Sequence, residues 1–200
     1  GINVTRHKAY TVSGEAHYVL APGMVQSFLS KNADIIHTHS YGYFQNHAGW
    51  IRERFQSTPW VITPHFHPSW SMWGGSKRKT LREFYDTVIG KGTLEAADLI
   101  TCVSKHERDM LVSEIGLKED NIKIIYNGIN WADWSSVPNK EVFRKQYPTI
   151  SEKFVLFAGR LATNKGLSDL ISAMKLIDKK SVDLVITGAD MGLGKQLEKE

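Results

Sequence analysis

The chain has 200 residues, of which 42% are hydrophobic and 23% charged, and 25 Lys and Arg against 21 Asp and Glu give a net charge of +4. This globular composition excludes collagen-like, disulfide-scaffold and disordered chains, and the mild positive charge with no recognition motif leads us to expect no nucleic-acid partner. The single cysteine, Cys102, excludes an internal disulfide and fits a reducing, cytoplasmic compartment, and no run approaches the roughly 20 apolar residues of a membrane span.

Short apolar, β-branched segments alternate with longer amphipathic ones along the chain. The short segments are apolar at nearly every position, which is typical of strands buried on both faces of a parallel sheet covered by helices. The predicted strands are Asp34–His39, Trp60–His65, Leu99–Val103, Ile122–Tyr126, Phe154–Ala158 and Asp183–Thr187.

The segments between these strands carry apolar residues at helical spacing. The predicted buried rows are Phe44, His47, Ala48, Ile51 and Phe55; Leu81, Phe84, Tyr85 and Val88; Met110, Leu111 and Ile115; and Leu167, Leu170, Ile171, Met174 and Ile177. Ser104 and Glu107 form a capping box directly after a strand, and Gly116 supplies a left-handed end to the helix that follows. The alternation of strands and helices predicts a doubly wound α/β fold.

The alternation breaks between Asn127 and Pro148. Asn127 and Gly128 are a turn signal, Pro138 follows a polar run, and the pattern resumes with the strand at 154–158. We therefore predict a linker near 128–140 and two α/β units, residues 1–134 and 135–200.

A glycine-containing basic loop joins the strand at 154–158 to the next helix. Gly159 and Gly166 would let the backbone approach a ligand, while Arg160 and Lys165 could bind phosphate oxygens at the helix N-terminus. The alternative is that both cations are solvated and the glycines only turn the chain.

A second loop, from Gly188 to Lys195, lacks the spacing of a phosphate-binding P-loop and the Ser or Thr that ends it. A strand-to-helix turn that faces a ligand remains an alternative for this second loop.

Two His-x-His pairs stand at the ends of predicted strands. His37 and His39 form one pair, and His65 and His67 form the other. Period-two spacing puts both members of a pair on one face if the strand continues that far. Three interpretations stay open: a role in chemistry or ligand binding, zinc chelation, and structural histidines.

Two tryptophans stand beside a run of four cations after the second His-x-His pair. The cluster comprises Trp70, Trp73, Lys77, Arg78, Lys79 and Arg82. Such a cluster suits anionic lipid headgroups or an anionic acceptor. The other interpretation is a loop before a helix with a solvated basic face, since the apolar row at 81–88 already explains most of the pattern.

Several segments together resemble the GT-B retaining glycosyltransferases of the group 1, or family 4, type. They are "ADIIHTHS", "PWVITPHFH", "AADLITCVSKHERDMLVSEIGL", "NIKIIYNGIN", "FVLFAGRLATNKGLSDLISAM" and "VDLVITGADMG", in the order found in that family. The resemblance implies two Rossmann-like units with parallel sheets, an acceptor-side unit first and a nucleotide-sugar donor unit second. Both would be incomplete, because the family has an earlier strand with a glycine-rich loop and a later glutamate motif.

The resemblance also implies an activity: transfer of a sugar from a UDP-, GDP- or ADP-sugar to an acceptor hydroxyl, with retention. Arg160 and Lys165, with Gly159, match donor diphosphate positions, and His65 matches a histidine that contacts the transferred sugar. Further expectations are a sugar-side role for His37, His39 and His67, a sugar, lipid-linked or other acceptor, a membrane surface as a further partner, and no metal or cofactor. We expect these 200 residues alone to be inactive.

Two other enzyme classes remain as alternatives. "IIHTHS" also resembles the opening His-x-His of metal-dependent hydrolases, although no later set of ligands has suitable spacing. The second alternative class is a sugar-nucleotide epimerase of GT-B architecture. A non-catalytic module that binds sugar nucleotides or membranes is a third hypothesis.

Overall fold

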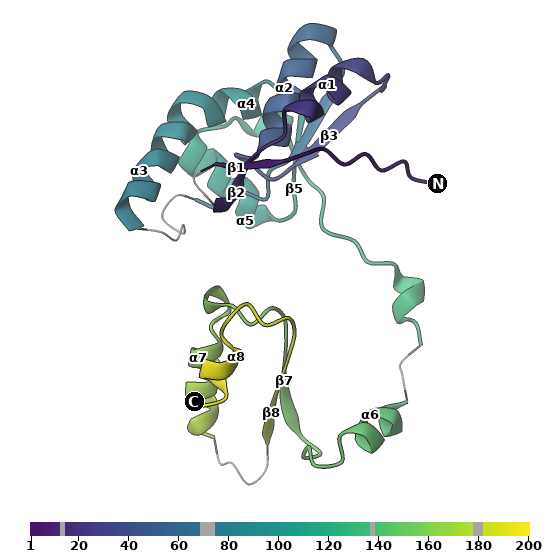
Figure 1. Ribbon diagram of the computed structural model, residues 1–200, viewed down its shortest axis with the longest axis vertical. Helices are drawn as coiled ribbons and strands as arrows, with labels where there is room; N and C mark the ends of the chain where they lie inside the picture. Colours follow the sequence, from purple (N-terminus) through teal and green to yellow (C-terminus); the bar gives the residue numbers. More distant parts are fainter. Residues whose placement is uncertain (13–14, 69–74, 137–138, 178–181) are drawn as a thin grey trace. The chain divides into compact units, whose positions relative to one another are not determined.

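The computed structural model describes residues 1–12, 15–68, 75–136, 139–177 and 182–200 (Figure 1). The chain divides into two compact units, Gly1–Ile129 and Asn130–Glu200, and each is described by itself. The division falls inside the segment 128–140, where the sequence predicts a linker.

The first unit begins with a hairpin and a helix that the sequence analysis did not predict. Strands β1 (Tyr10–Val12) and β2 (Glu15–Leu20) pair antiparallel. Helix α1 (Pro22–Ser30) follows and lies beside α2 (Phe44–Gln56), and Pro22 fits its first turn because no intrahelical donor is needed there (Figure 1).

A four-stranded sheet forms the centre of this unit. Strands β3 (Ile36–His39), β4 (Trp60–Thr63), β5 (Leu99–Cys102) and β6 (Ile122–Ile124) are parallel and lie in chain order. The sequence predicted all four strands, and each predicted range is one or two residues longer than the observed strand. The parallel α/β prediction is confirmed, but the described strands do not include the reversal of order that marks the centre of a doubly wound sheet.

Helical segments connect each strand of this sheet to the next. Helix α2 joins β3 to β4, and the β4–β5 connection ends in a continuous helical segment, residues 75–95, that changes its hydrogen-bonding pattern twice. The helical segment comprises α3 (Gly75–Tyr85), the π-helical turn η2 (Asp86–Gly90) and α4 (Lys91–Glu95). The helices of the β5–β6 connection are α5 (Lys105–Met110), the π-helical η3 (Leu111–Ile115) and the 3-10 turn η4 (Glu119–Asn121).

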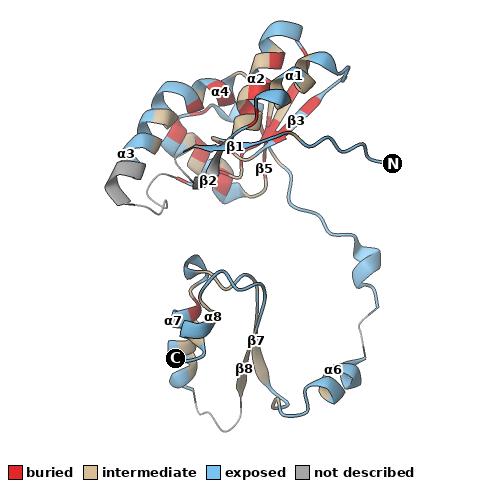
Figure 2. Cartoon of the chain, in the orientation of Figure 1, coloured by how far each residue is buried: buried red, intermediate tan, exposed pale blue. Residues whose placement is uncertain are grey.

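The two faces of the sheet differ in character. On one face, Ile36, Trp60, Ile62 and Ile100 are buried in a core shared with helical residues such as Leu94 (Figure 2). The strand register puts the alternate residues on the other face, where the edge strand exposes two histidines. Burial on both faces, predicted from continuous apolarity, is therefore wrong for this edge strand.

Helix α2 approaches the sheet closely at a glycine. A Cβ atom on Gly49 would lie 2.8 Å from the indole nitrogen of Trp60, which is fully buried. That indole N–H donates to the Thr38 hydroxyl at 2.9 Å on the neighbouring strand. The buried row predicted for α2 is wrong at its last residue, because the Phe55 side chain near the end of the helix is 77% exposed.

The second unit contains a smaller parallel sheet. Strands β7 (Phe154–Ala158) and β8 (Asp183–Thr187) pair in parallel as predicted, with α7 (Leu167–Lys175) between them. The remaining elements are η5 (Trp131–Trp134), α6 (Lys140–Gln146), η6 (Thr163–Lys165) and α8 (Gly194–Leu197). The prediction that these strands are buried on both faces is wrong, since Leu156 in β7 is 56% exposed. Across the residues that the structure describes, no helix is both long and apolar enough to cross a bilayer.

Candidate functional site

Three histidines from two neighbouring strand ends lie together in the first unit. His37 and His39 share the exposed face of β3, as period-two spacing predicted, with ring centroids 4.5 Å apart. Nδ1 of His39 lies 3.2 Å from Nε2 of His65, and the two rings are stacked. The structure therefore brings together three of the four predicted histidines.

The second His-x-His pair is not part of a strand. Strand β4 ends at Thr63, and His65 has a left-handed backbone with φ of 47°, uncommon for a residue with a side chain. The condition for a shared strand face is thus not met, and His67 is exposed. The chain turns sharply after the strand, and this turn places the His65 ring against His39.

A row of hydroxyl groups continues from His37 across the sheet. Nε2 of His37 shares a 2.7 Å hydrogen bond with Thr63 Oγ1, and Thr63 Oγ1 shares a 2.5 Å bond with Thr101 Oγ1. Burial, and then the neighbouring His39, lower the pKa of His37 from its ordinary value. The hydroxyl row fixes the His37 ring, while burial and His39 favour its neutral form.

The loop that carries His65 is held by a buried carboxylate. Oε1 of Glu107 accepts a 2.8 Å hydrogen bond from the Phe66 backbone N–H, and Oε2 accepts one of 2.7 Å from Val103. The predicted capping box is confirmed in that the Ser104 hydroxyl accepts from the Glu107 N–H at 3.1 Å. Sequence reasoning assigned Glu107 only this local role. Its second contact, to a loop 41 residues earlier, has no local sequence signal.

An ion pair between Arg82 and Asp86 holds the other side of the loop that carries His65 and His67. Nε of Arg82 lies 2.7 Å from Oδ1 of Asp86, Nη2 donates to the His67 carbonyl at 3.3 Å, and the guanidinium stacks over the Tyr41 ring. The Tyr41 hydroxyl donates to the same Asp86 oxygen at 2.8 Å; burial, then Asp86, raises the pKa of Tyr41.

Arg82 therefore differs from its expected place in an exposed aromatic and basic cluster, since its side chain is only 12% exposed. Lys79 is exposed and lies 3.8 Å from Glu83. Trp70 and Trp73, and the side chains of Lys77 and Arg78, lie outside the described residues.

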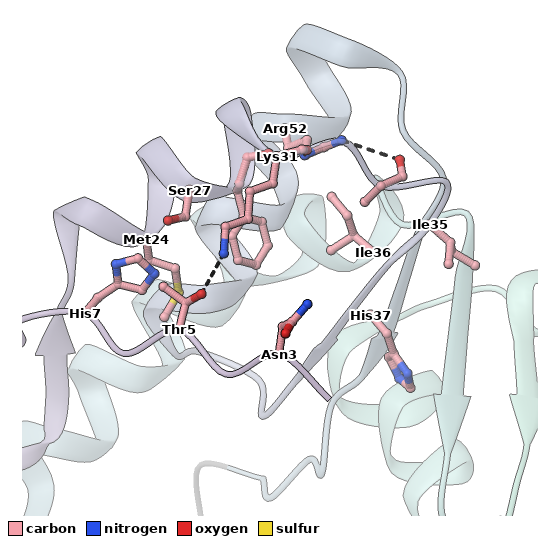
Figure 3. A pocket seen from close by; sticks show the side chains of 12 residues that line it. Asn3, Thr5, His7, Met24, Ser27, Lys31, Ile35, Ile36, His37 and Arg52 are labelled. Carbon is pink, nitrogen blue, oxygen red and sulfur yellow. Dashed lines mark hydrogen bonds between the residues drawn. The ribbon is translucent and has the colours of Figure 1, made fainter. Parts of the chain in front are cut away.

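A pocket of ≈ 370 Å³ opens between the N-terminal segment, α1 and the start of β3 (Figure 3). Arg52 is almost fully buried beside it and donates to the carbonyls of Phe28, Lys31 and Ala33. His37 lies at its rim. Since Arg52 has its partners within the protein, it holds α1 in place and is not free to bind a ligand.

In the second unit, Arg160 and Lys165 flank the turn from β7 into α7. Both side chains are exposed, and neither forms a hydrogen bond or ion pair with any residue that the structure describes. Gly166 has a left-handed backbone with φ of 66°, which a glycine adopts without strain and which starts α7. The predicted basic loop is therefore present, with both cations facing solvent.

The loop after β8 packs directly against this turn. A Cβ atom on Gly188 would overlap the carbonyl oxygen of Gly159, so the two strand ends touch through backbone alone. Oδ1 of Asp190 accepts hydrogen bonds of 2.8–2.9 Å from the N–H groups of residues 192, 193 and 194, and these bonds lower its pKa. The backbone N–H groups of this loop thus bind the Asp190 carboxylate, whereas those of a P-loop bind phosphate.

Metal chelation by the histidines was one open interpretation. Among residues 1–12, 15–68, 75–136, 139–177 and 182–200, no three His, Cys, Asp or Glu side chains converge in a geometry that could hold a metal ion. The rings of His39 and His65 instead share a hydrogen bond, and the His37 ring bonds to the Thr63 hydroxyl.

Comparison with known proteins identifies the class to which this fold belongs. The model of Glycosyltransferase Family 4 matches residues 3–132, and the chain belongs to that family. The resemblance inferred from the sequence motifs is thereby confirmed.

Individual relatives agree with this assignment. An uncharacterized glycosyltransferase of Methanocaldococcus jannaschii is 38% identical over 102 residues, which are 48% of this chain and 26% of the relative. The alpha-maltose-1-phosphate synthase of Mycolicibacterium smegmatis is 26% identical over 147 residues, 70% of this chain and 37% of that protein. The crystal structure of a glycosyltransferase from Rickettsia africae matches with a TM-score of 0.59 at 18% identity, over 88% of this chain and 44% of its own.

These matches also define the extent of the likeness. The chain spans between 25% and 42% of the length of the curated relatives that it matches. The structural match confirms the GT-B-like α/β fold. None of these relatives carries a hydrolase or epimerase name.

Proposed function

We propose that the protein carrying this chain transfers a hexose from a nucleoside diphosphate sugar to an acceptor hydroxyl, with retention of configuration at the anomeric carbon. Membership in Glycosyltransferase Family 4 supports sugar transfer in general. The donor class rests on one observation: Arg160 and Lys165 are exposed and unpaired within the described chain, at the end of β7 and the start of α7. This is where parallel α/β folds bind phosphate groups.

The two cations have distinct tasks in this proposal. The Arg160 guanidinium can donate two parallel hydrogen bonds to diphosphate oxygens, while Lys165 adds a compact charge. Fixed positive charge stabilises the negative charge that develops on the departing diphosphate, which lowers the barrier to breaking the sugar–oxygen bond. His65 orients the transferred sugar in the first unit, with its ring held by His39. No enzyme nucleophile is required.

A binding titration tests the donor class. The complete protein is titrated with UDP, GDP and ADP and with their glucose conjugates, in the presence and absence of EDTA. We expect one diphosphate to bind whether or not EDTA is present, and Arg160→Ala to weaken it about 10- to 100-fold through the loss of charge-assisted bonds. Lys175→Ala is the matched control, because Lys175 is exposed at the other end of α7.

Equal binding by Arg160→Ala and wild type would contradict the assignment of the phosphate site. Retention is tested separately, by determining the anomeric configuration of the product by NMR before it mutarotates. A product of inverted configuration would overturn that part of the proposal and leave the donor site standing.

A further inference from the structure

The turn after β4 holds His65 in a backbone conformation that needs support from its surroundings. Its φ of 47° lies in the left-handed region, which costs free energy for a residue with a side chain and persists only where neighbouring contacts impose it. Residues held in this way are concentrated at catalytic and ligand sites. The contacts that impose this conformation on His65 therefore point to residues that serve the site.

The residues on either side of His65 are both held against Tyr41. Before His65, the Pro64 carbonyl accepts a 2.6 Å hydrogen bond from the Tyr41 N–H. After it, the Phe66 ring is 2% exposed and packs edge-on against the Tyr41 ring, with centroids 5.4 Å apart. The Arg82 guanidinium lies 5.9 Å from the centroid of the same Phe66 ring. His65 thus lies between two anchored residues, and the peptide group that joins it to Phe66 sets its orientation.

Glu107 binds that peptide group directly. Its Oε1 accepts the 2.8 Å hydrogen bond from the Phe66 N–H, and because a peptide group is planar, this bond also fixes the ψ angle of His65. The carboxylate is 4% exposed, and no Lys, Arg or His among the described residues forms an ion pair with it. A buried carboxylate without a cation is costly unless hydrogen bonds satisfy it. The bonds from Phe66 and Val103 are therefore what holds Glu107 in this place.

Arg82 secures the far end of the same loop. Its Nη2 donates to the His67 carbonyl, and its ion pair with Asp86 keeps the guanidinium on the inner side of the helical segment. The buried row predicted for this segment is wrong on its outer side, where the exposed fractions are 59–61% at Leu81, Phe84 and Val88. Because Arg82 and the Phe66 ring remain, removal of the Glu107 carboxylate should free one peptide group and leave the rest of the loop in place.

We propose that Glu107 is a positioning residue for sugar binding and acts through His65. Glu107 fixes the backbone of His65, while His39 fixes its ring through the 3.2 Å contact with Nε2. Within the described chain nothing bonds to the other ring nitrogen, Nδ1, and the residue is partly exposed. Nδ1 is therefore the nitrogen available to a sugar hydroxyl. The inference rests on the proposed function, which assigns the sugar contact to His65, and it adds the residue that prepares this contact.

The 15N shifts of the histidine rings test the positioning without any ligand. These shifts show which ring nitrogen carries the proton and which accepts a hydrogen bond. In the complete protein, Glu107→Ala should move the resonances of His65 and His39, because the freed peptide group lets the two rings separate. Glu107→Gln keeps one acceptor oxygen and should move them less. His47 on α2, whose ring contacts Tyr85, should stay in place.

The Ile115→Ala variant separates positioning from stability. Ile115 is 8% exposed in η3, in the same connection as Glu107, so its truncation destabilises that connection but removes no hydrogen bond from the loop. This variant should leave the resonances of His65 and His39 unchanged. Unmoved His65 resonances in Glu107→Ala would overturn the positioning role, and so would an equal movement in Ile115→Ala.

Donor binding tests whether the positioning serves the sugar. Wild type is screened against UDP-glucose, UDP-galactose, GDP-mannose and ADP-glucose, and the conjugate that binds is compared with its free diphosphate. We expect Glu107→Ala to weaken binding of the conjugate about five- to tenfold, as for one lost hydrogen bond, and to leave binding of the free diphosphate unchanged. The His65→Ala variant should show the same loss, and the double variant should lose no more, because both changes remove one contact.

The outcomes separate this inference from the proposed function. If His65→Ala weakens binding of the conjugate and Glu107→Ala does not, the positioning role is wrong and the sugar contact of His65 stands. Losses that add in the double variant would also overturn the positioning role, since Glu107 would then act independently of His65. If His65→Ala leaves binding of the conjugate unchanged, the sugar contact in the proposed function is wrong, and the inference falls with it.

Discussion

The carboxylate of Glu107 and the backbone N–H of Phe66 are joined by a 2.8 Å hydrogen bond between a helix N-terminus and a loop 41 residues earlier. The same carboxylate accepts from Val103, so one side chain fixes the turn after β5 and the loop after β4. This loop carries His65 on one side of Phe66 and His67 on the other. The geometry at the end of β4 therefore depends on a residue from another connection.

Glu107→Ala should destabilise the protein by about 3 kcal/mol, because it leaves two backbone N–H groups without an acceptor, one of them buried. Glu107→Gln keeps one acceptor oxygen and should lose about half as much. Urea unfolding followed by circular dichroism measures both changes. Glu114→Gln, at an exposed position in η3, is the control and should unfold like wild type.

Gly188→Ala should destabilise the second unit by about 2 kcal/mol or more, because the new Cβ would overlap the Gly159 carbonyl oxygen and the backbone φ is 149°. Gly192→Ala separates the two causes. Its φ is 102° but nothing lies within 4 Å of the added Cβ, so it should cost only about 1 kcal/mol. Equal losses of thermal stability in the two variants would refute the close backbone contact.

His39→Gln should raise the pKa of His37 without restoring its ordinary value of 6.5, because burial is the larger cause of the lowering and remains. The pKa of His47 is lowered by burial alone, so it should not move in this variant. NMR titration of the ring protons measures both in one experiment. A shift at both histidines would indicate a general structural change.

The lowered pKa of His37 also has a consequence for stability. The folded state binds fewer protons than the unfolded state between the lowered pKa and 6.5, so stability should fall as pH drops through this window. The His37→Gln variant should lose that part of the pH dependence. An unchanged unfolding profile between pH 5 and 7 in the variant would contradict the linkage.

Cys102 should be almost unreactive in the folded protein, because burial raises the pKa of its thiol from 9.0 to about 12. The thiolate population near neutral pH is then about 1000-fold lower than in the unfolded chain, and alkylation slows by a similar factor. Iodoacetamide labelling with and without urea measures the ratio. The unfolded thiol ionises first, so this contribution to stability is present below pH 9 and is lost as pH rises toward 12.

The parallel strands and their helices were predictable because their signals are local. A run such as Trp60–Thr63 is apolar throughout, and Ser104 with Glu107 marks a helix start within four residues. The hairpin of β1 and β2 was missed, because Tyr10–Val12 and Glu15–Leu20 contain polar residues and too few apolar positions to distinguish them from a loop. These two strands are stabilised by pairing with each other, and the residue pattern within each short segment does not reveal its partner.

The candidate sites divide in the same way. The basic loop with Arg160 and Lys165 was found, since it follows a strand and contains its own glycines. The position of Arg82 was not predicted: helical spacing describes a row but does not say which side faces the core. The pairing of Arg82 with Asp86 settles this, and it turns Leu81 and Phe84 outward. The site roles of both histidine pairs remain predictions.

The contact between Gly49 and Trp60 couples positions that are usually free to change separately. Helix and strand lie this close because position 49 has no side chain, and the indole that fills the space also depends on the Thr38 hydroxyl. A larger residue at 49 would need a smaller ring at 60, and the threonine would then lose its donor. Across relatives with this packing, the three positions should therefore vary together, and a substitution at one should be tolerated only with its companions.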